Sequence, residues 1–190
     1  MWALLLIGCS TPTTVTAAWR DPAYSQGPMR KILVIAQTPV ETTRHDLEDT
    51  MAASLEKRGT AALASYRVFQ APPEQDSMQH YLDSEHYDGA LVVKFQGTRT
   101  QSSVQASPRY DNYYGTRFNG VAGGYYSNGY DYTVYTDRYV NVDTALWTAH
   151  TDKVAWSVST QTINPLSSSD AVHSLVDKLV DTMAKSHLVR

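Results

Sequence analysis

The stretch Tyr132–Ile163 contains the pattern that most constrains the fold of this chain. Two alternating arms flank the short polar segment His150–Asp152, which has the composition of a turn. Side chains along a strand point to opposite faces with a period of two, so the pattern predicts a β-hairpin with one buried face. The residues that share this face are Val140, Val142, Thr144 and Leu146 in the first arm and Val154, Trp156, Val158 and Thr160 in the second.

The register of this hairpin follows from the position of its turn. A slip of one residue would place the apolar row of one arm on the solvent-exposed face, so the pairing is strongly specified. The pairs predicted by closure at His150–Asp152 are Leu146 with Trp156, Thr144 with Val158, and Val142 with Thr160.

The first third of the chain has the pattern of a strand–helix–strand unit. Lys31–Ala36 is a continuous apolar run, as expected of a strand covered on both faces. Leu47, Met51 and Leu55 follow at helical spacing, and Ala61–Phe69 then predicts a second strand. Such units place their two strands in parallel.

The remaining elements complete a mixed α/β fold. We expect a helix over Glu74–Ser84, a third strand over Ala90–Phe95, and a C-terminal helix over Asp170–Leu188. The predicted order is β-α-β-α-β-β-β-α, parallel in its first half and an antiparallel meander towards the C-terminus. We expect a single domain over residues 19–190.

The apolar run at the N-terminus ends at Cys9, the only cysteine of the chain. Leu6-Ile7-Gly8-Cys9 resembles the bacterial lipobox, in which the cysteine is acylated and becomes the first residue of the mature protein. Residues 1–9 are then a lipoprotein signal segment, and its short length predicts a true start further upstream. The alternative is a buried N-terminal strand with Cys9 in the core.

Lipidation of Cys9 would make the membrane a partner of the chain. More than one acyl chain anchors stably, and no later apolar run approaches the 18 residues of a transmembrane helix. Ser10, rather than aspartate, follows the cysteine, which under the sorting rules of such lipoproteins implies the outer membrane, on its periplasmic side. We expect residues 10–18 to form a short polar tether.

Residues 109–131 stand apart in composition. They hold six tyrosines, five glycines and three asparagines, which favours an aromatic-rich loop insert. Tyrosine, glycine and asparagine are typical of adaptable binding surfaces, for a protein partner or for the sugar rings of peptidoglycan. A mobile flap without a ligand is the alternative. The candidate binding residues are Tyr110, Tyr113, Tyr114, Tyr125, Tyr126 and Tyr130.

Several classes of function are not supported. A formal net charge of −3 without a Lys/Arg cluster argues against nucleic acid. The segment Ala36–Glu41, directly after the first predicted strand, contains no glycine for a phosphate-binding loop, so we expect no nucleotide. Neither G-x-S-x-G nor H-E-x-x-H occurs, and the sequence predicts no enzyme, no cofactor and no metal site.

Other polar groups have simple structural interpretations. His80 and His86 lie near acidic residues around the second helix, where a solvated helix face explains them better than a metal site. Glu48, Asp49 and Glu56 are interpreted as solubilising charge on the outer face of the first helix.

The core-forming motifs together resemble a known group of proteins. These motifs are the lipobox at Cys9, Trp19, the run Lys31–Ala36 with its helix, Asp88–Val93, and Leu146-Trp147 with Val154–Ser157. They resemble bacterial lipoproteins that carry a domain of unknown function and are related in outline to the TolB N-terminal-like α/β fold. The resemblance implies a fold and an envelope location but no activity.

Three functional hypotheses follow. The first is a non-enzymatic, membrane-anchored envelope lipoprotein that acts as a protein-docking, assembly or adaptor module for an unknown partner. The alternative is a module that binds glycan or peptidoglycan through the tyrosine-rich insert. A hydrolase with a scattered active site is a third, weaker interpretation.

Overall fold

The computed structural model describes residues 12–71, 73–113, 125–151 and 153–190. The chain divides into two compact units, Met1–Arg99 with Arg138–Arg190, and Thr100–Asp137. We call the first the α/β unit and the second the ribbon.

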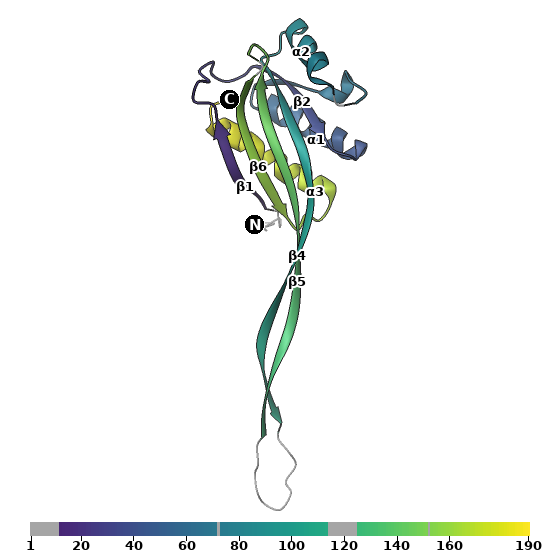
Figure 1. Ribbon diagram of the computed structural model, residues 1–190, viewed down its shortest axis with the longest axis vertical. Helices are drawn as coiled ribbons and strands as arrows, with labels where there is room; N and C mark the ends of the chain where they lie inside the picture. The colour runs from purple at the N-terminus through teal and green to yellow at the C-terminus, as the bar shows by residue number, and fades with distance from the viewer. Residues whose placement is uncertain (1–11, 72, 114–124, 152) are drawn as a thin grey trace, which may run out of the picture. The chain divides into compact units, whose positions relative to one another are not determined.

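The described elements confirm the predicted mixed α/β class. The sheet has six strands in the order β1-β6-β5-β4-β2-β3 (Figure 1). From β2 onwards the predicted succession of strands and helices is confirmed, and β1 precedes it. In chain order the elements are β1 (Thr13–Arg20), β2 (Lys31–Gln37), α1 (Glu41–Lys57), β3 (Ala61–Ala64), the 3-10 helix η1 (Ser65–Arg67), α2 (Gln75–Ser84), β4 (Gly89–Tyr113), β5 (Tyr125–Thr148), β6 (Lys153–Ile163) and α3 (Ser168–Lys185).

Strand β2 lies between two parallel neighbours, as its uninterrupted apolar run predicts. It pairs with β3 from Lys31 opposite Ala61, and with β4 from Ile32 opposite Gly89. Its residues from Ile32 to Ala36 are all buried. The second predicted strand is shorter than expected, because β3 ends at Ala64 and the chain turns into η1.

The predicted hairpin register is confirmed. Strands β5 and β6 are antiparallel, and the pairs Leu146–Trp156, Thr144–Val158 and Val142–Thr160 are all present. These six side chains are buried. These rows therefore lie on one face of the sheet. Val154, predicted to belong to the same row, is the exception, because the register shifts between Leu146 and Trp147 and Val154 lies opposite Trp147.

The helices cover the two faces unequally. Alternate residues of β2 point to opposite sides, so Ile32 and Val34 meet α1 and α3, whereas Leu33 and Ile35 join the smaller cluster with Leu82 of α2. Figure 1 shows α1 and α3 lying along the same face of the sheet. The stripe predicted for the last helix is buried in the larger cluster; its members are Val172, Leu175, Val176, Leu179, Val180 and Met183.

The tether predicted for residues 10–18 is wrong from Thr13 onwards. Thr13–Arg20 forms β1, the edge strand that pairs antiparallel with β6 from Thr13 opposite Thr162 to Arg20 opposite Trp156. The hydroxyl of Thr13 lies 2.8 Å from that of Thr162 and 2.7 Å from that of Ser174 on α3. This strand is held by main-chain pairing and not by an apolar row, since it is exposed along most of its length.

Replacing Thr144 by valine should stabilise the α/β unit. Among the described residues, the buried hydroxyl Oγ1 of Thr144 has no hydrogen-bond partner. Valine has the same shape without the polar atom, so we expect Thr144→Val to raise the free energy of unfolding by about 1 kcal/mol. Urea unfolding followed by tryptophan fluorescence, to which the buried Trp156 contributes, measures it.

The matched control for this variant is Thr160→Val in the paired strand. The hydroxyl of Thr160 is also buried but donates to the main-chain oxygen of Val142 at 3.2 Å. Removing this satisfied donor should not stabilise the unit. A loss of stability in Thr144→Val, or an equal gain in both variants, would contradict the assignment.

Candidate functional site

The tyrosine-rich stretch is largely strand rather than loop. Strand β4 continues to Tyr113 and β5 begins at Tyr125, so the predicted loop insert over 109–131 is wrong for 109–113 and for 125–131. Residues 114–124 lie outside the described residues. The outer parts of β4 and β5 form the ribbon, Thr100–Asp137.

The ribbon has two chemically different faces. The hydroxyl of Ser102 lies 3.2 Å from that of Thr136, so these two residues point to the same side. Strand alternation then places three exposed aromatic or aliphatic residues of β5 on that side, together with two aliphatic residues of β4. We call this the apolar face; its residues are Val104, Ala106, Tyr130, Tyr132 and Val134.

The other side of the ribbon is predominantly polar. It carries the alternate residues of both strands, and we call it the polar face. Tyr135 is an aromatic residue on it. Its other residues are Gln101, Ser103, Gln105, Ser107, Asp131, Thr133 and Asp137.

The apolar face is strongly exposed to solvent. The exposed fractions are 64% for Val104, 61% for Tyr130, 69% for Tyr132 and 62% for Val134. The neighbouring strands do not extend along the ribbon, because β2 pairs with β4 only as far as Lys94 and β6 pairs with β5 only from Tyr139. A two-stranded ribbon is marginally stable in water by itself, and open strand edges pair readily with other strands. The exposed apolar face and the open strand edges of the ribbon therefore favour docking of a partner.

The structure places most of the predicted binding residues on the ribbon. Tyr110 and Tyr113 belong to β4, and Tyr125, Tyr126 and Tyr130 belong to β5. Tyr114 lies outside the described residues, and among the others only the side chain of Tyr130 is described.

Sequence reasoning did not single out Tyr132 and Val134 as candidate binding residues. The alternation of Tyr130, Tyr132 and Val134 with Asp131 and Thr133 is a strand signal that could have identified them. The composition of the surrounding stretch instead favoured a loop.

The predicted lipidation residue Cys9 also lies outside the described residues, which begin at Pro12. Strand β1 begins at Thr13, at the edge of the sheet where Thr162 is its partner. Among the described helices, none is long and apolar enough to cross a membrane.

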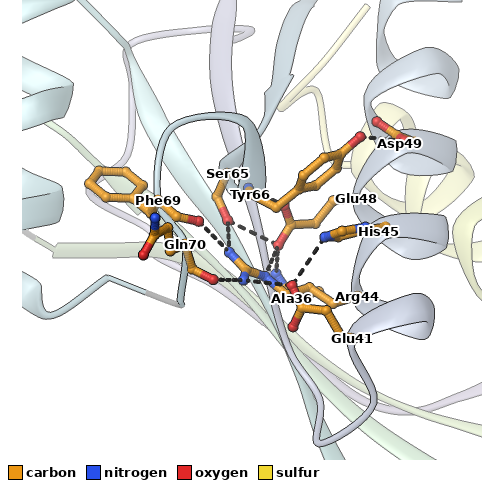
Figure 2. Close-up of polar contacts among 10 residues, drawn as sticks. All are labelled: Ala36, Glu41, Arg44, His45, Glu48, Asp49, Ser65, Tyr66, Phe69 and Gln70. Carbon is orange, nitrogen blue, oxygen red and sulfur yellow. Dashed lines mark hydrogen bonds and ion pairs between the residues drawn. The ribbon is translucent and has the colours of Figure 1, made fainter.

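A buried charged cluster on α1 corrects the sequence interpretation of Glu48. This side chain is fully buried rather than solubilising, and its carboxylate accepts four hydrogen bonds (Figure 2). The donors are the main-chain N–H of Ala36 at 2.9 Å, Nε of Arg44 at 3.2 Å, the hydroxyl of Ser65 at 2.9 Å and the main-chain N–H of Tyr66 at 2.9 Å.

The position of this carboxylate follows from the sheet. Strand β3 ends at Ala64, opposite Val34, so the Ala36 N–H lies beyond the end of the neighbouring strand. Glu48 supplies the acceptor that a longer strand would have provided. The cluster therefore joins β2, α1 and η1.

Arg44 completes the cluster and is 1% exposed. Its guanidinium donates to the side chains of Glu41 and Ser65, and to main-chain oxygens after η1, those of Phe69 at 3.2 Å and Gln70 at 3.0 Å (Figure 2). Both charges are thus engaged with the fold itself, and this geometry is that of a structural ion pair.

The outer edge of the cluster is partly exposed. The His45 ring stacks on Tyr66 with centroids 3.9 Å apart, and the Tyr66 hydroxyl donates to Asp49 at 2.7 Å (Figure 2). Arg67 donates to Asp49 at 2.8 Å. The pKa of Arg67 is raised above its usual value, first by the hydrogen bond with Tyr66 and second by the hydrogen bond with Asp49. Within the described ranges, no group of three or more His, Cys, Asp or Glu residues could hold a metal ion.

A second aromatic surface lies on the sheet face opposite α1 and α3. Trp19, one of the residues that carry the family resemblance, is 50% exposed there. Together with Trp147 it lines a shallow depression of about 440 Å³. Asp143 lies in the same depression and accepts from Ser159 at 2.6 Å and from Gln96 at 2.7 Å. Aromatic rings beside hydrogen-bonding groups suit a polar ligand with flat apolar faces.

Comparison with known proteins identifies the fold alone. No protein-family model matches the chain, and no curated protein sequence matches it. Two solved structures of PelC dodecamers from Paraburkholderia phytofirmans have TM-scores of 0.51 and 0.50 at 16% and 14% identity; they cover 93% and 94% of this chain and 99% of PelC. Lipoprotein GNA1162 from Neisseria meningitidis has a TM-score of 0.44 at 14% identity, covering 82% of this chain and 98% of its own.

Proposed function

We propose that this chain is a non-enzymatic, lipid-anchored protein of the bacterial envelope that acts as an assembly module. Its ribbon docks against the ribbons of further copies of the chain. The observation that carries this proposal is the exposed apolar face of the ribbon, on two strands whose outer edges continue beyond their neighbours in the sheet.

Further copies of the same chain are the partner that this surface fits best. Open strand edges offer N–H and C=O groups that another extended strand can pair with, and an identical ribbon carries the same spacing and an equivalent apolar face. Copies anchored in one membrane share an orientation and a raised effective concentration. The PelC structures that share this fold are described as dodecamers, which supports self-assembly as a property of such folds.

The membrane anchor is supported by the lipobox-like sequence at Cys9. Because β1 begins at Thr13, acylation of Cys9 would hold this end of the α/β unit close to the lipid surface. Ser10 supports the outer membrane as the location, with the chain on the periplasmic side.

The non-enzymatic part of the proposal is supported by the state of the buried charges. Arg44 and Glu48 are directed at main-chain groups and at each other, and neither reaches solvent. Their hydrogen bonds are made with groups of the chain itself and not with a substrate.

The docking surface is tested by a matched pair of variants in β5. Val134 and Thr133 are adjacent, exposed and β-branched, but they lie on the apolar and the polar face respectively. We expect Val134→Glu to convert oligomers of the full chain into monomers, because a carboxylate in an apolar interface is desolvated without a partner. Thr133→Glu should leave the oligomer intact. Analytical ultracentrifugation of the full chain in detergent measures both.

The proposal fails if the native chain sediments as a monomer at micromolar concentration. It also fails if Thr133→Glu dissociates the oligomer as fully as Val134→Glu does, since added negative charge alone would then explain the effect.

The alternative function is binding of glycan or peptidoglycan. The specific observation in its favour is the depression that contains Trp19, Trp147 and Asp143, because sugar rings stack on aromatic side chains while hydroxyls bond to carboxylates. Cosedimentation of the native chain with purified peptidoglycan discriminates this alternative from self-assembly.

A further inference from the structure

The α/β unit contains a cavity that neither the ribbon nor the charged cluster explains. It has a volume of about 270 Å³ and is lined by residues at the carboxyl end of β2, on the part of β4 beside it, in the first turns of α1 and α3, and on the adjoining parts of β5 and β6. In sheets with parallel strands, ligands bind preferentially at the carboxyl ends of those strands.

The lining of this cavity is amphipathic. Its floor consists of buried apolar side chains from both helices and from the central strands, and its rim carries exposed polar side chains. The floor residues are Leu47, Val93, Val142, Val172 and Leu175, and the exposed rim residues are Gln37, Thr98, Arg138, Ser167 and Ser168.

Arg138 is the one charged residue in this lining, and the described lining contains no carboxylate. Its main chain is fixed by two hydrogen bonds with Asn164, of 2.7 and 2.8 Å. Its Nη2 donates to the main-chain oxygen of Pro165, another lining residue, at 2.6 Å. A guanidinium has five N–H donors, so this bond leaves others for an anion at the rim.

We propose that this cavity binds a single acyl chain that ends in a carboxylate, as in a medium-chain fatty acid. The chain packs on the apolar floor and the carboxylate pairs with Arg138. One chain is expected because the volume lies at the lower end of the range for small-molecule sites, which begins at about 300 Å³. This inference is independent of the proposed assembly role.

Decanoate and decanol are the probes that test it. The protein is the full chain with Cys9→Ser, which cannot be acylated, and binding is measured by isothermal titration calorimetry. We expect saturable binding of one decanoate per chain. Arg138→Gln should weaken decanoate about tenfold, the cost of one charge-assisted contact, and leave decanol unchanged.

Two further variants keep this test specific. Lys94→Gln removes a positive charge from the same strand as Val93 but on the opposite sheet face, where Lys94 lines the Trp19 depression, and it should not change the affinity. Arg138→Lys keeps the charge and should restore most of the decanoate affinity. Equal weakening by Arg138→Gln and Lys94→Gln would overturn the role of Arg138.

Filling the cavity tests the position of the chain. Ala171 on α3 is a half-buried lining residue, and Ala171→Leu places a larger side chain in the space. We expect it to weaken decanoate and decanol alike by at least tenfold, with an unfolding midpoint no lower than that of the native chain. Unchanged affinity in this variant, or no saturable binding of decanoate to the native chain, would overturn the proposal.

Discussion

Replacing Glu48 by alanine should lower the free energy of unfolding of the α/β unit by about 3–5 kcal/mol, the range for breaking a buried ion pair. The change leaves the guanidinium of Arg44 buried without its carboxylate. It also removes the acceptor of the Ala36 and Tyr66 N–H groups and of the Ser65 hydroxyl. Chemical unfolding followed by tryptophan fluorescence measures the loss.

Glutamine at position 48 should not rescue this loss. Both carboxylate oxygens of Glu48 accept from main-chain N–H groups, Oε1 from Ala36 and Oε2 from Tyr66. An amide must direct its NH₂ group at one of these donors, in either orientation.

Glu56→Ala is the control on the same helix, because Glu56 is exposed and its removal should change the free energy of unfolding by less than about 0.5 kcal/mol. Similar effects of Glu48→Ala and Glu56→Ala would show that the cluster does not hold the fold together.

Replacing Gly89 by alanine should be nearly as damaging, at about 3 kcal/mol. A Cβ at this position would lie 2.1 Å from the main-chain oxygen of Trp147 and 3.0 Å from the sulfur of Met29. The first contact is with backbone of the neighbouring strand, which cannot turn away as a flexible side chain could. We therefore expect β4 and β5 to separate locally, and a lower unfolding midpoint in urea.

Gly59→Ala distinguishes this clash from a purely conformational cost. Gly59 follows α1 with φ of +80°, and a Cβ there would meet nothing closer than Cδ of Arg190 at 4.0 Å. Its cost should be that of a left-handed backbone alone, about 1 kcal/mol. A smaller effect for Gly89→Ala than for Gly59→Ala would contradict the steric argument.

The parts of the fold that sequence reasoning predicted share a local apolar period. The register of β5 and β6 follows from two alternating rows, and the buried stripe of α3 follows from helical spacing. In both cases the residues that determine the element lie within it. Burial of one face then leaves a single arrangement that hides the whole row.

The candidate site was predictable only in part. The composition of the tyrosine-rich stretch predicts a binding region, which stays a prediction, and its glycines and asparagines concealed the two strands. The pairing of Ser102 with Thr136 determines which side chains share a face, and residues 34 positions apart give no local signal of such a contact.

The sequence by itself determined the mixed α/β class, the strand β2 that is covered on both faces, the hairpin register and the apolar stripe of the last helix. Only the tertiary structure decided that Thr13–Arg20 is a strand, that Glu48 is buried, and that Val104 and Val134 lie on one exposed face. The physical reason is the range of the interactions. Apolar periodicity is written in neighbouring residues, whereas edge-strand pairing and the burial of a charge depend on hydrogen-bond partners that the fold brings from distant parts of the chain.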